Sequence, residues 1–204
     1  HREARLIARL EHPHIVPVYD FDGAHEPPYI VMRYFKGSTL KDVMRLNTQP
    51  GSVRLPINDI VYLLQQVASA LDYAHRQGVI HRDIKPSNII LDQDGNAFLS
   101  DFGIARLSGD MALTASGMSG TPAYMAPEQS TGASETGPQA DLYSLGVVAF
   151  ELLTGSLPFD AETQLAMAFK HLHEPLPRAS ERNKTLSNAV DAVLGRVLAK
   201  QPGE

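Results

Sequence analysis

The 204-residue sequence contains no cysteine. This excludes disulfides and thiolate zinc sites and suits a reducing compartment, so we expect a cytoplasmic chain. The sequence also lacks a run of roughly 18 apolar residues, the length that a bilayer-spanning helix needs. Its most apolar segment, Tyr143 to Leu153, is short and lies beside Asp141 and Glu151, which is typical of a buried helix. We therefore expect no membrane segment in this chain, although a longer parent protein could carry a membrane anchor elsewhere.

Basic residues are not in excess. Lysine and arginine total 18 against 23 aspartates and glutamates, which gives a formal net charge of -5. Nucleic-acid binding needs clustered basic side chains, so nucleic acid is not an expected partner. A hydrophobic content of 43% with 20% charged residues is ordinary for a packed globular fold. The length fits one large domain, or one lobe with part of another.

Several enzyme motifs are also missing. The sequence has no Gly-x-x-x-x-Gly-Lys loop, no Gly-x-Ser-x-Gly elbow and no His-Glu-x-x-His helix. P-loop, esterase and zincin assignments therefore have no support.

The first half of the chain predicts a mixture of strands and helices. Residues 1–11 carry a helical apolar face that stops at His12-Pro13, and two β-rich stretches, 15–21 and 29–34, are expected to pair as antiparallel strands. A long amphipathic helix is predicted from Asn58, as its N-cap, to Gln77, with Gly78 as the stop signal.

The second half is predicted to be mostly helical. Two short apolar runs, 89–91 and 97–99, flank Asp94-Gly95, which favours a hairpin with a type I′ turn. A long loop is expected over 104–138 because this stretch is rich in small and polar residues. Helices are predicted over 141–153, 161–171 and 187–200, so the predicted fold class is α+β.

One run of eight residues carries the clearest chemical signal. His81-Arg82-Asp83-Ile84-Lys85-Pro86-Ser87-Asn88 is followed by Asp101-Phe102-Gly103 and by Ala126-Pro127-Glu128. Phosphoryl transfer needs an acceptor for the substrate hydroxyl proton, a cation at the phosphate and oxygen ligands for a metal. These segments contain candidates for all three in a suitable order.

In these motifs the chain resembles the eukaryotic-type Ser/Thr protein kinases, and bacterial members in particular. The resemblance implies that Asp83 is the catalytic base, that Lys85 contacts the transferred phosphate, and that Asn88 and Asp101 bind the metal. It implies ATP with Mg²⁺, or with Mn²⁺, as cofactors and protein Ser/Thr hydroxyls as acceptors. A kinase homodimer is compatible with the family.

The resemblance also implies a kinase-like division of the chain. Residues 1–35 would be a remnant of the N-terminal lobe, with one helix, two strands and the hinge. Residues 36–204 would be the mostly helical C-terminal lobe with the catalytic and activation loops. The residues expected to contact the nucleotide are Met32, Arg33, Phe35, Ile90 and Lys85. An ordinary edge strand is the alternative reading of 29–37.

Six positions are expected to have regulatory roles. In the family, an arginine at the position of Arg82 binds a phosphate on the activation loop, which makes Thr114 and Ser116 candidate phosphorylation sites. An unmodified loop is the alternative. Glu3 is a helix residue whose carboxylate would pair with a phosphate-binding lysine. The other two positions are Thr121, before the Ala-Pro-Glu motif, and Glu128, within that motif.

Parts of the family pattern are missing from the sequence. It has neither a Gly-x-Gly-x-x-Gly loop nor a Val-Ala-Ile-Lys strand, both of which would precede Glu3. The arginine that pairs with the Ala-Pro-Glu glutamate would come directly after residue 204, so Glu128 is expected to lack its partner. We therefore expect a kinase domain trimmed at both ends, less stable than the whole domain and inactive as a fragment.

Other interpretations stay open at this point. A pseudokinase acting as a binding module and a small-molecule kinase of the same fold both fit much of the pattern. Asp92 to Gly95 is interpreted as a turn rather than a calcium loop, because its spacing does not match. His171 and His173 are interpreted as a solvated helix end rather than as metal ligands.

Overall fold

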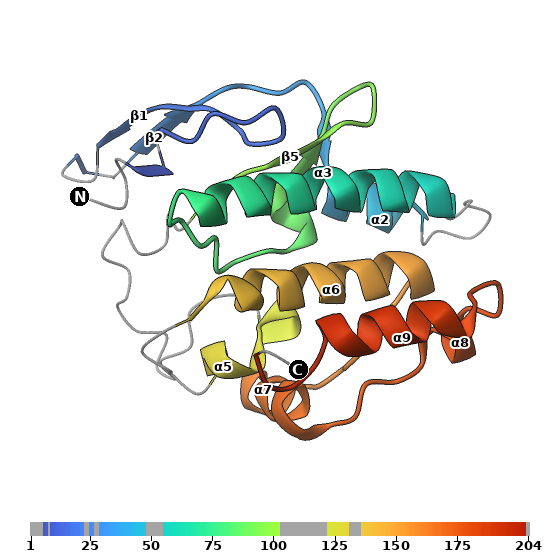
Figure 1. Cartoon of the computed structure of the whole chain (residues 1–204). Coiled ribbons are helices and arrows are strands. Elements are labelled where there is room, and N and C mark those ends of the chain that lie inside the picture. Colours follow the sequence, from blue (N-terminus) through green and yellow to red (C-terminus); the bar gives the residue numbers. More distant parts are fainter. Residues whose placement is uncertain are drawn as a thin grey trace.

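The computed structural model describes residues 6–7, 9–22, 25–26, 29–47, 55–102, 122–130 and 136–202. Figure 1 shows two small sheets on one side of the long helix α3 (Ile57–Arg76), a short helix beside α3, and the helices α5 to α9 on the other side. Among the described residues, no helix is both long enough and apolar enough to cross a bilayer.

The first sheet is the predicted antiparallel pair. Strand β1 (Val18–Asp22) pairs with β2 (Tyr29–Met32), with Phe21 opposite Ile30. Both strands are shorter than the predicted stretches. Of the helix predicted over 1–11, the described part includes helical Leu6 and Ile7.

The second sheet has three strands in the order β3-β4-β5. They are β3 (Ser38–Thr39), β4 (Ile89–Leu91) and β5 (Ala97–Leu99), and β4 and β5 form the predicted hairpin. The predicted type I′ turn is wrong, because Leu91 pairs with Ala97 and residues 92–96 form a wider connection. The Asp92 carboxylate stabilises this connection by accepting from the backbone N–H groups of Asp94 (2.9 Å) and Asn96 (2.8 Å).

Strand β3 leads directly into helix α2 (Leu40–Asn47), and neither was predicted. The Thr39 hydroxyl accepts from the Asp42 N–H at 3.2 Å and donates to the Asp42 carboxylate at 2.6 Å. This is a reciprocal cap of a helix start. The pattern Thr39-x-x-Asp42 was therefore the sequence signal for this helix.

Helix α3 was predicted almost at its observed bounds. Its start needs one correction: the N-cap residue is Pro56, and Asn58 lies inside the first turn. Proline is well suited there, because its fixed φ fits a helix start and its missing N–H would have no helical partner. The helix ends as predicted before Gly78, whose φ is 75°.

The later helices differ from the prediction mainly at their ends. The predicted segments correspond to α6 (Pro138–Thr154), α7 (Gln164–His173) and α9 (Asn188–Val197). Helix α7 begins later than expected because the Thr163 side chain accepts from the Ala166 N–H at 3.1 Å and caps it. The short helix α8 (Ala179–Arg182) was not predicted.

The loop predicted over 104–138 is wrong where the structure describes it. Residues 122–130 contain a 3₁₀ turn, η2 (Pro122–Tyr124), and a short helix, α5 (Pro127–Ser130). Both are too short to leave a helical period of apolar residues in the sequence.

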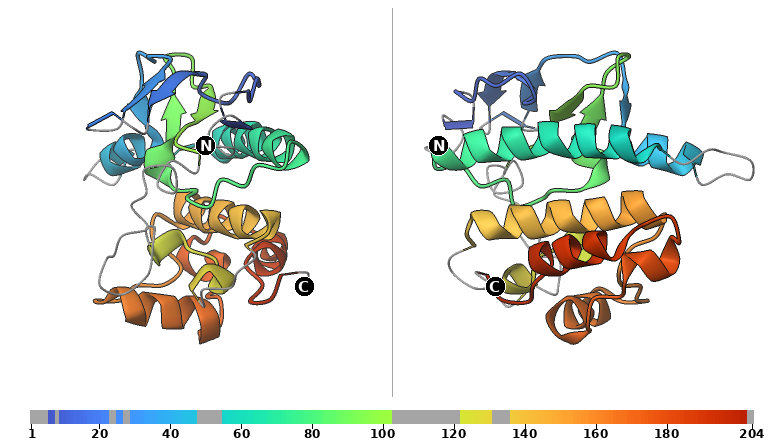
Figure 2. Two further views of the ribbon diagram at one scale, coloured as in Figure 1. Left: turned by 90° about the vertical axis from the view of Figure 1, so that its left-hand side faces the viewer. Right: turned by 45° about the vertical axis from the view of Figure 1, so that its right-hand side comes forward.

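Helix α6 lies at the centre of the molecule and packs into two hydrophobic clusters. On one face Leu145, Val148 and Leu152 pack into the cluster around α3. On another, Val147 and Phe150 pack with Leu194 of α9. The views in Figure 2 agree that α6 lies between α3 and α9. A helix that is apolar on both faces is expected to be buried, and α6 thereby gives the site a rigid support.

Candidate active site

The segment His81 to Asn88, which we call the catalytic loop, connects α3 to β4. Its backbone is bonded to the carboxylate of Asp141, a fully buried residue in the first turn of α6. One oxygen accepts from the His81 N–H at 2.8 Å and the other from the Arg82 N–H at 2.7 Å. The His75 imidazole lies 2.7 Å from the same carboxylate. A buried carboxylate needs such partners, and here they determine the path of the loop.

Arg82 has a backbone conformation that only a well-supported loop can maintain. Its φ is 67°, in the left-handed region that non-glycine residues rarely adopt. Its N–H is bonded to Asp141, and its carbonyl accepts from the Gln129 side-chain amide at 2.9 Å. Helices α5 and α6 thus fix the residue that precedes Asp83 from two sides.

The fully buried His81 joins the catalytic loop to β5. Its Nε2 lies 2.8 Å from the Ser100 carbonyl, which can only accept, so Nε2 carries the proton. Its Nδ1 accepts from the Asp83 N–H at 3.3 Å. The ring also packs against Phe102, with centroids 4.6 Å apart. Phe102 belongs to the same buried hydrophobic cluster as Ile7, and the partly buried Val18 packs against that cluster.

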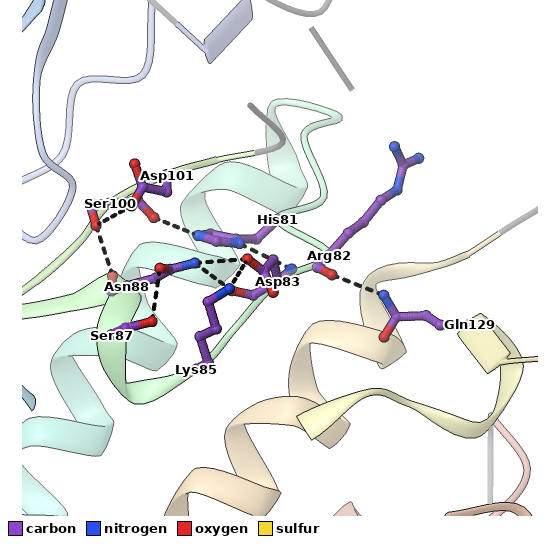
Figure 3. A network of polar contacts seen from close by, with 9 residues as sticks. All are labelled: His81, Arg82, Asp83, Lys85, Ser87, Asn88, Ser100, Asp101 and Gln129. Atoms are coloured by element: carbon purple, nitrogen blue, oxygen red, sulfur yellow. Dashed lines mark hydrogen bonds and ion pairs between the residues drawn. The ribbon is translucent and has the colours of Figure 1, made fainter. Parts of the chain in front are cut away.

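Asp83, Lys85 and Asn88 lie together and point toward one another (Figure 3). The Lys85 ammonium is 2.6 Å from an Asp83 carboxylate oxygen, and the Asn88 amide donates to the same oxygen at 3.1 Å. That amide also donates to the Asp83 carbonyl at 2.9 Å. The Asp83 side chain is 34% exposed, so a substrate can reach it.

The β4–β5 hairpin brings Asp101 next to Asn88. The Ser100 N–H and hydroxyl both donate to the Asn88 carbonyl, at 2.9 Å and 3.1 Å. The Ser100 hydroxyl also lies 3.3 Å from the Asp101 carboxylate. Asp101 itself has a left-handed φ of 62°, the second strained residue of the site.

The Asn88 and Asp101 side chains fit a magnesium ion chemically. The Asn88 amide nitrogen is used by Asp83, which leaves its oxygen as the side-chain atom that can bind a cation. Asp101 contributes an exposed carboxylate. One amide oxygen and one carboxylate are hard ligands of the kind that Mg²⁺ uses together with substrate phosphates.

The predicted nucleotide-side residues lie on β2, on β4 and in the segment between β2 and β3. Met32 ends β2 and is half-buried. Arg33 is exposed, and its N–H donates to the Pro17 carbonyl at 3.0 Å, so this amide is not offered to a ligand. The Phe35 ring packs on Phe98 with centroids 4.3 Å apart, and Phe98 is the cross-strand partner of Ile90.

The regulatory predictions have mixed outcomes. Glu3, Thr114, Ser116 and Thr121 lie outside the described residues. In Figure 3 the Arg82 side chain extends away from Asp83 and Lys85. The expectation that Glu128 lacks a partner is wrong: it is half-buried, has an interaction partner, and its charge contributes to the raised pKa of Tyr143, of which burial is the main cause.

Two further groups were not singled out as site residues. Asp141, paired with His75, accepts from the catalytic-loop amides, and Gln129 of α5 donates to the Arg82 carbonyl. The available signal for Asp141 was a charged residue at the start of an apolar helix, because such a residue must find buried partners.

His171 corrects a prediction. It is fully buried rather than a solvated helix end, and it contacts Tyr143 and the Ala123 carbonyl. Periodicity alone could not show this, because the partners lie on η2 and α6.

Comparisons with known proteins agree with this arrangement. A family model described as the protein kinase domain matches residues 1–204. The chain is 45% identical over 208 residues to "Serine/threonine-protein kinase PknJ" of Mycobacterium tuberculosis, covering 98% of this chain and 34% of that protein. It is 38% identical over 202 residues to "Serine/threonine-protein kinase PrkC" of Bacillus subtilis, covering 98% and 30%.

A third relative, "Serine/threonine-protein kinase PknH" of Mycobacterium tuberculosis, is 40% identical over 202 residues, covering 98% of this chain and 31% of that protein. The chain thus spans about a third of the length of the curated relatives that it matches. The family implies the use of ATP and a divalent metal. The fold, the clustered motif residues and these matches together show that the chain belongs to the protein kinase family.

Proposed function

We propose that this chain is the catalytic part of a serine/threonine protein kinase, which transfers the γ-phosphate of ATP to Ser or Thr hydroxyls of proteins. The observation that supports the proposal most directly is the cluster of Asp83, Lys85 and Asn88 with Asp101 beside it. The names of the relatives support the choice of Ser and Thr as acceptors.

In this proposal Asp83 accepts the proton of the substrate hydroxyl. The Asn88 amide donates to one Asp83 carboxylate oxygen and so fixes its orientation. Lys85 is paired with that carboxylate at 2.6 Å and has a flexible side chain that can turn to a phosphate once substrates bind. Orienting the hydroxyl and balancing phosphate charge are the main catalytic tasks in phosphoryl transfer.

Asn88 and Asp101 are the proposed metal ligands. A bound Mg²⁺, or Mn²⁺ with the same kind of ligands, neutralises charge on the transferred phosphate. The chain's contribution is to hold both oxygens at the end of one hairpin, through the bonds of Ser100 to the Asn88 carbonyl. On the nucleotide side, we assign Met32, Phe35, Ile90 and the backbone carbonyl of Arg33, whose N–H is bonded to Pro17, to the adenine contact.

The test uses the full-length protein that contains this chain, with Mg²⁺, radiolabelled ATP and a generic protein substrate. Asp83→Asn is expected to lower kcat by about 10²–10⁴-fold, because it removes the proton acceptor but keeps the volume. Asp94→Asn is the matched control, since Asp94 is exposed in the 92–96 connection. Equal incorporation by wild type and Asp83→Asn would refute the assigned base.

Analysis of the labelled residues tests the acceptor class. We expect phosphoserine and phosphothreonine; label on tyrosine alone, or on an added small molecule in place of protein, would refute the proposed specificity. The cytoplasmic location and a homodimer stay predictions. Fractionation of cells and sedimentation of the purified protein would test them.

A further inference from the structure

A buried imidazole outside the catalytic loop binds the segment next to the site. His171 lies in the last turn of α7 and is fully buried. Its Nδ1 is 2.9 Å from the Tyr143 hydroxyl of α6, and its Nε2 is 3.1 Å from the Ala123 carbonyl of η2. One ring thus joins three elements that are far apart in the sequence.

The direction of these hydrogen bonds follows from chemistry. The Ala123 carbonyl can only accept, so Nε2 must donate to it. Burial, with a smaller effect of the Lys200 ammonium, lowers the pKa of His171 to about 4, so the ring is neutral at neutral pH and Nδ1 must accept from Tyr143. The Ala123 carbonyl therefore selects the tautomer with the proton on Nε2, and the Tyr143 hydroxyl donates to the other ring nitrogen.

The end of α7 that contains His171 is itself fixed. The Lys200 ammonium donates to the His171 carbonyl at 2.7 Å and lies 4.5 Å from the centre of the Phe159 ring. A cation at a helix C-terminus satisfies its free carbonyls and interacts favourably with the helix dipole. The Phe159 ring also meets the His171 imidazole edge-on at 5.0 Å. His171 is therefore a rigid support for η2.

The segment that His171 supports borders the catalytic loop. Tyr124 and Met125 line one small cavity together with Asp83. Tyr124 is also bonded to α6, because its hydroxyl donates to Glu151 at 2.6 Å. Because this segment borders Asp83, we expect a protein chain whose hydroxyl reaches Asp83 to lie beside it, and the position of η2 then limits where that chain can lie.

We propose that His171 is a positioning residue for the protein substrate: through Ala123 it fixes η2 at the distance from Asp83 that a bound peptide requires. The inference rests on the proposed kinase function and deepens it. His171 does not touch the reacting atoms. Its loss should therefore weaken productive binding of the protein substrate far more than the use of ATP.

Two substitutions separate the two hydrogen bonds of the ring. His171→Asn keeps an acceptor near the position of Nδ1 for Tyr143, but its side chain is too short to reach Ala123. His171→Gln places an amide N–H near the position of Nε2 and can still donate to Ala123. The matched control is His173→Leu, because His173 lies on the same helix but is exposed.

The experiment measures KM for a protein substrate, KM for ATP and the slow hydrolysis of ATP by water, in the full-length protein. We expect His171→Asn to raise KM for the protein substrate about tenfold, the effect of leaving one buried carbonyl unsatisfied. KM for ATP and the hydrolysis rate should change by less than about twofold. His171→Gln should stay within about threefold of wild type, and His173→Leu should equal it.

The outcomes are distinguishable. A wild-type protein that phosphorylates no protein refutes the proposed function itself. An active wild type in which His171→Asn leaves KM for the protein substrate unchanged, or raises both KM values equally, refutes only the role of His171. If His171→Asn does not fold, Tyr143→Phe replaces it, because that change keeps the imidazole and removes the hydrogen bond to Nδ1 that holds the ring against η2. An unchanged KM for the protein substrate in that variant would overturn the inference.

Discussion

The catalytic loop and the β1–β2 strand pair are built in opposite ways. In the loop, His81 is fully buried, and so is its partner Asp141 on α6. On the strand pair and the segment after it, large apolar side chains are exposed, with Tyr19 at 66% and Tyr34 at 87%. The loop therefore depends on buried polar bonds that a single substitution can break, whereas the strand pair should tolerate substitution on its exposed positions.

The largest effect is expected from Asp141→Ala. This change removes, at a fully buried position, the acceptor of two catalytic-loop amides and the partner of the half-buried His75. We expect the free energy of unfolding to fall by about 3–5 kcal/mol, the cost of breaking a buried charged network. Chemical denaturation measures this value.

The control for that experiment is Asp160→Ala, because Asp160 is exposed. It should change the free energy of unfolding by less than about 0.5 kcal/mol. A similarly small decrease in the free energy of unfolding in both variants would mean that Asp141 does not support the loop. The catalytic loop would then be no more sensitive to substitution than the strand pair.

The second-largest effect is expected in the pH dependence of stability, because His171 is another buried polar group like those that support the catalytic loop. Its pKa is about 4 in the folded protein because of burial, against the ordinary value of 6.5 in the unfolded chain. Between these values the unfolded chain binds the proton and the folded one does not, so stability falls as pH falls from 6.5 to 4 and the loss levels off below 4. The full contribution is about 3 kcal/mol.

Comparison with His171→Gln isolates this effect. Burial raises the pKa of Glu151, which gives a slope of the opposite sign, but that contribution is present in both proteins. Chemical denaturation at several pH values should show a steeper acid loss in wild type than in the variant. Parallel pH profiles would contradict the buried, neutral state of the imidazole.

The sequence predicted those parts of the molecule that leave a local pattern. Helix α3 has a long apolar period, and the hairpin places two apolar runs around Asp94-Gly95, so both were found. The cluster of Asp83, Lys85 and Asn88 was predicted as well, because the three residues lie within one short segment.

The parts that were missed depend on contacts between distant segments. Asp141 lies 60 positions from His81, and His171 lies 48 positions from Ala123. A buried polar residue chooses its partners by tertiary packing, which periodicity does not encode. The short elements η2 and α5 were missed for another reason, because an element of so few residues is too short to show a helical repeat of apolar residues.

An effect of intermediate size is expected from Gly37→Ala, in the segment between β2 and β3 that follows the strand pair. An added Cβ would lie 2.0 Å from the Leu91 carbonyl oxygen, a backbone atom that cannot move without disturbing β4. We expect the free energy of unfolding, measured by thermal denaturation, to fall by about 1–3 kcal/mol. Gly195→Ala in α9 meets nothing within 4 Å and should instead stabilise the protein, by about 0.5–1 kcal/mol. Equal effects would contradict the close approach at β4.

The smallest effect is expected on the exposed side, from Tyr34→Ser. Because this ring is 87% exposed, its removal should change the free energy of unfolding by less than about 0.5 kcal/mol. The neighbouring Phe35→Ser should cost more, about 1–2 kcal/mol, because that ring is half-buried on Phe98. Thermal unfolding of both variants measures the difference between adjacent residues. A loss above about 1 kcal/mol for Tyr34→Ser would show that another surface covers this ring, and the strand pair would then be as dependent on its contacts as the catalytic loop.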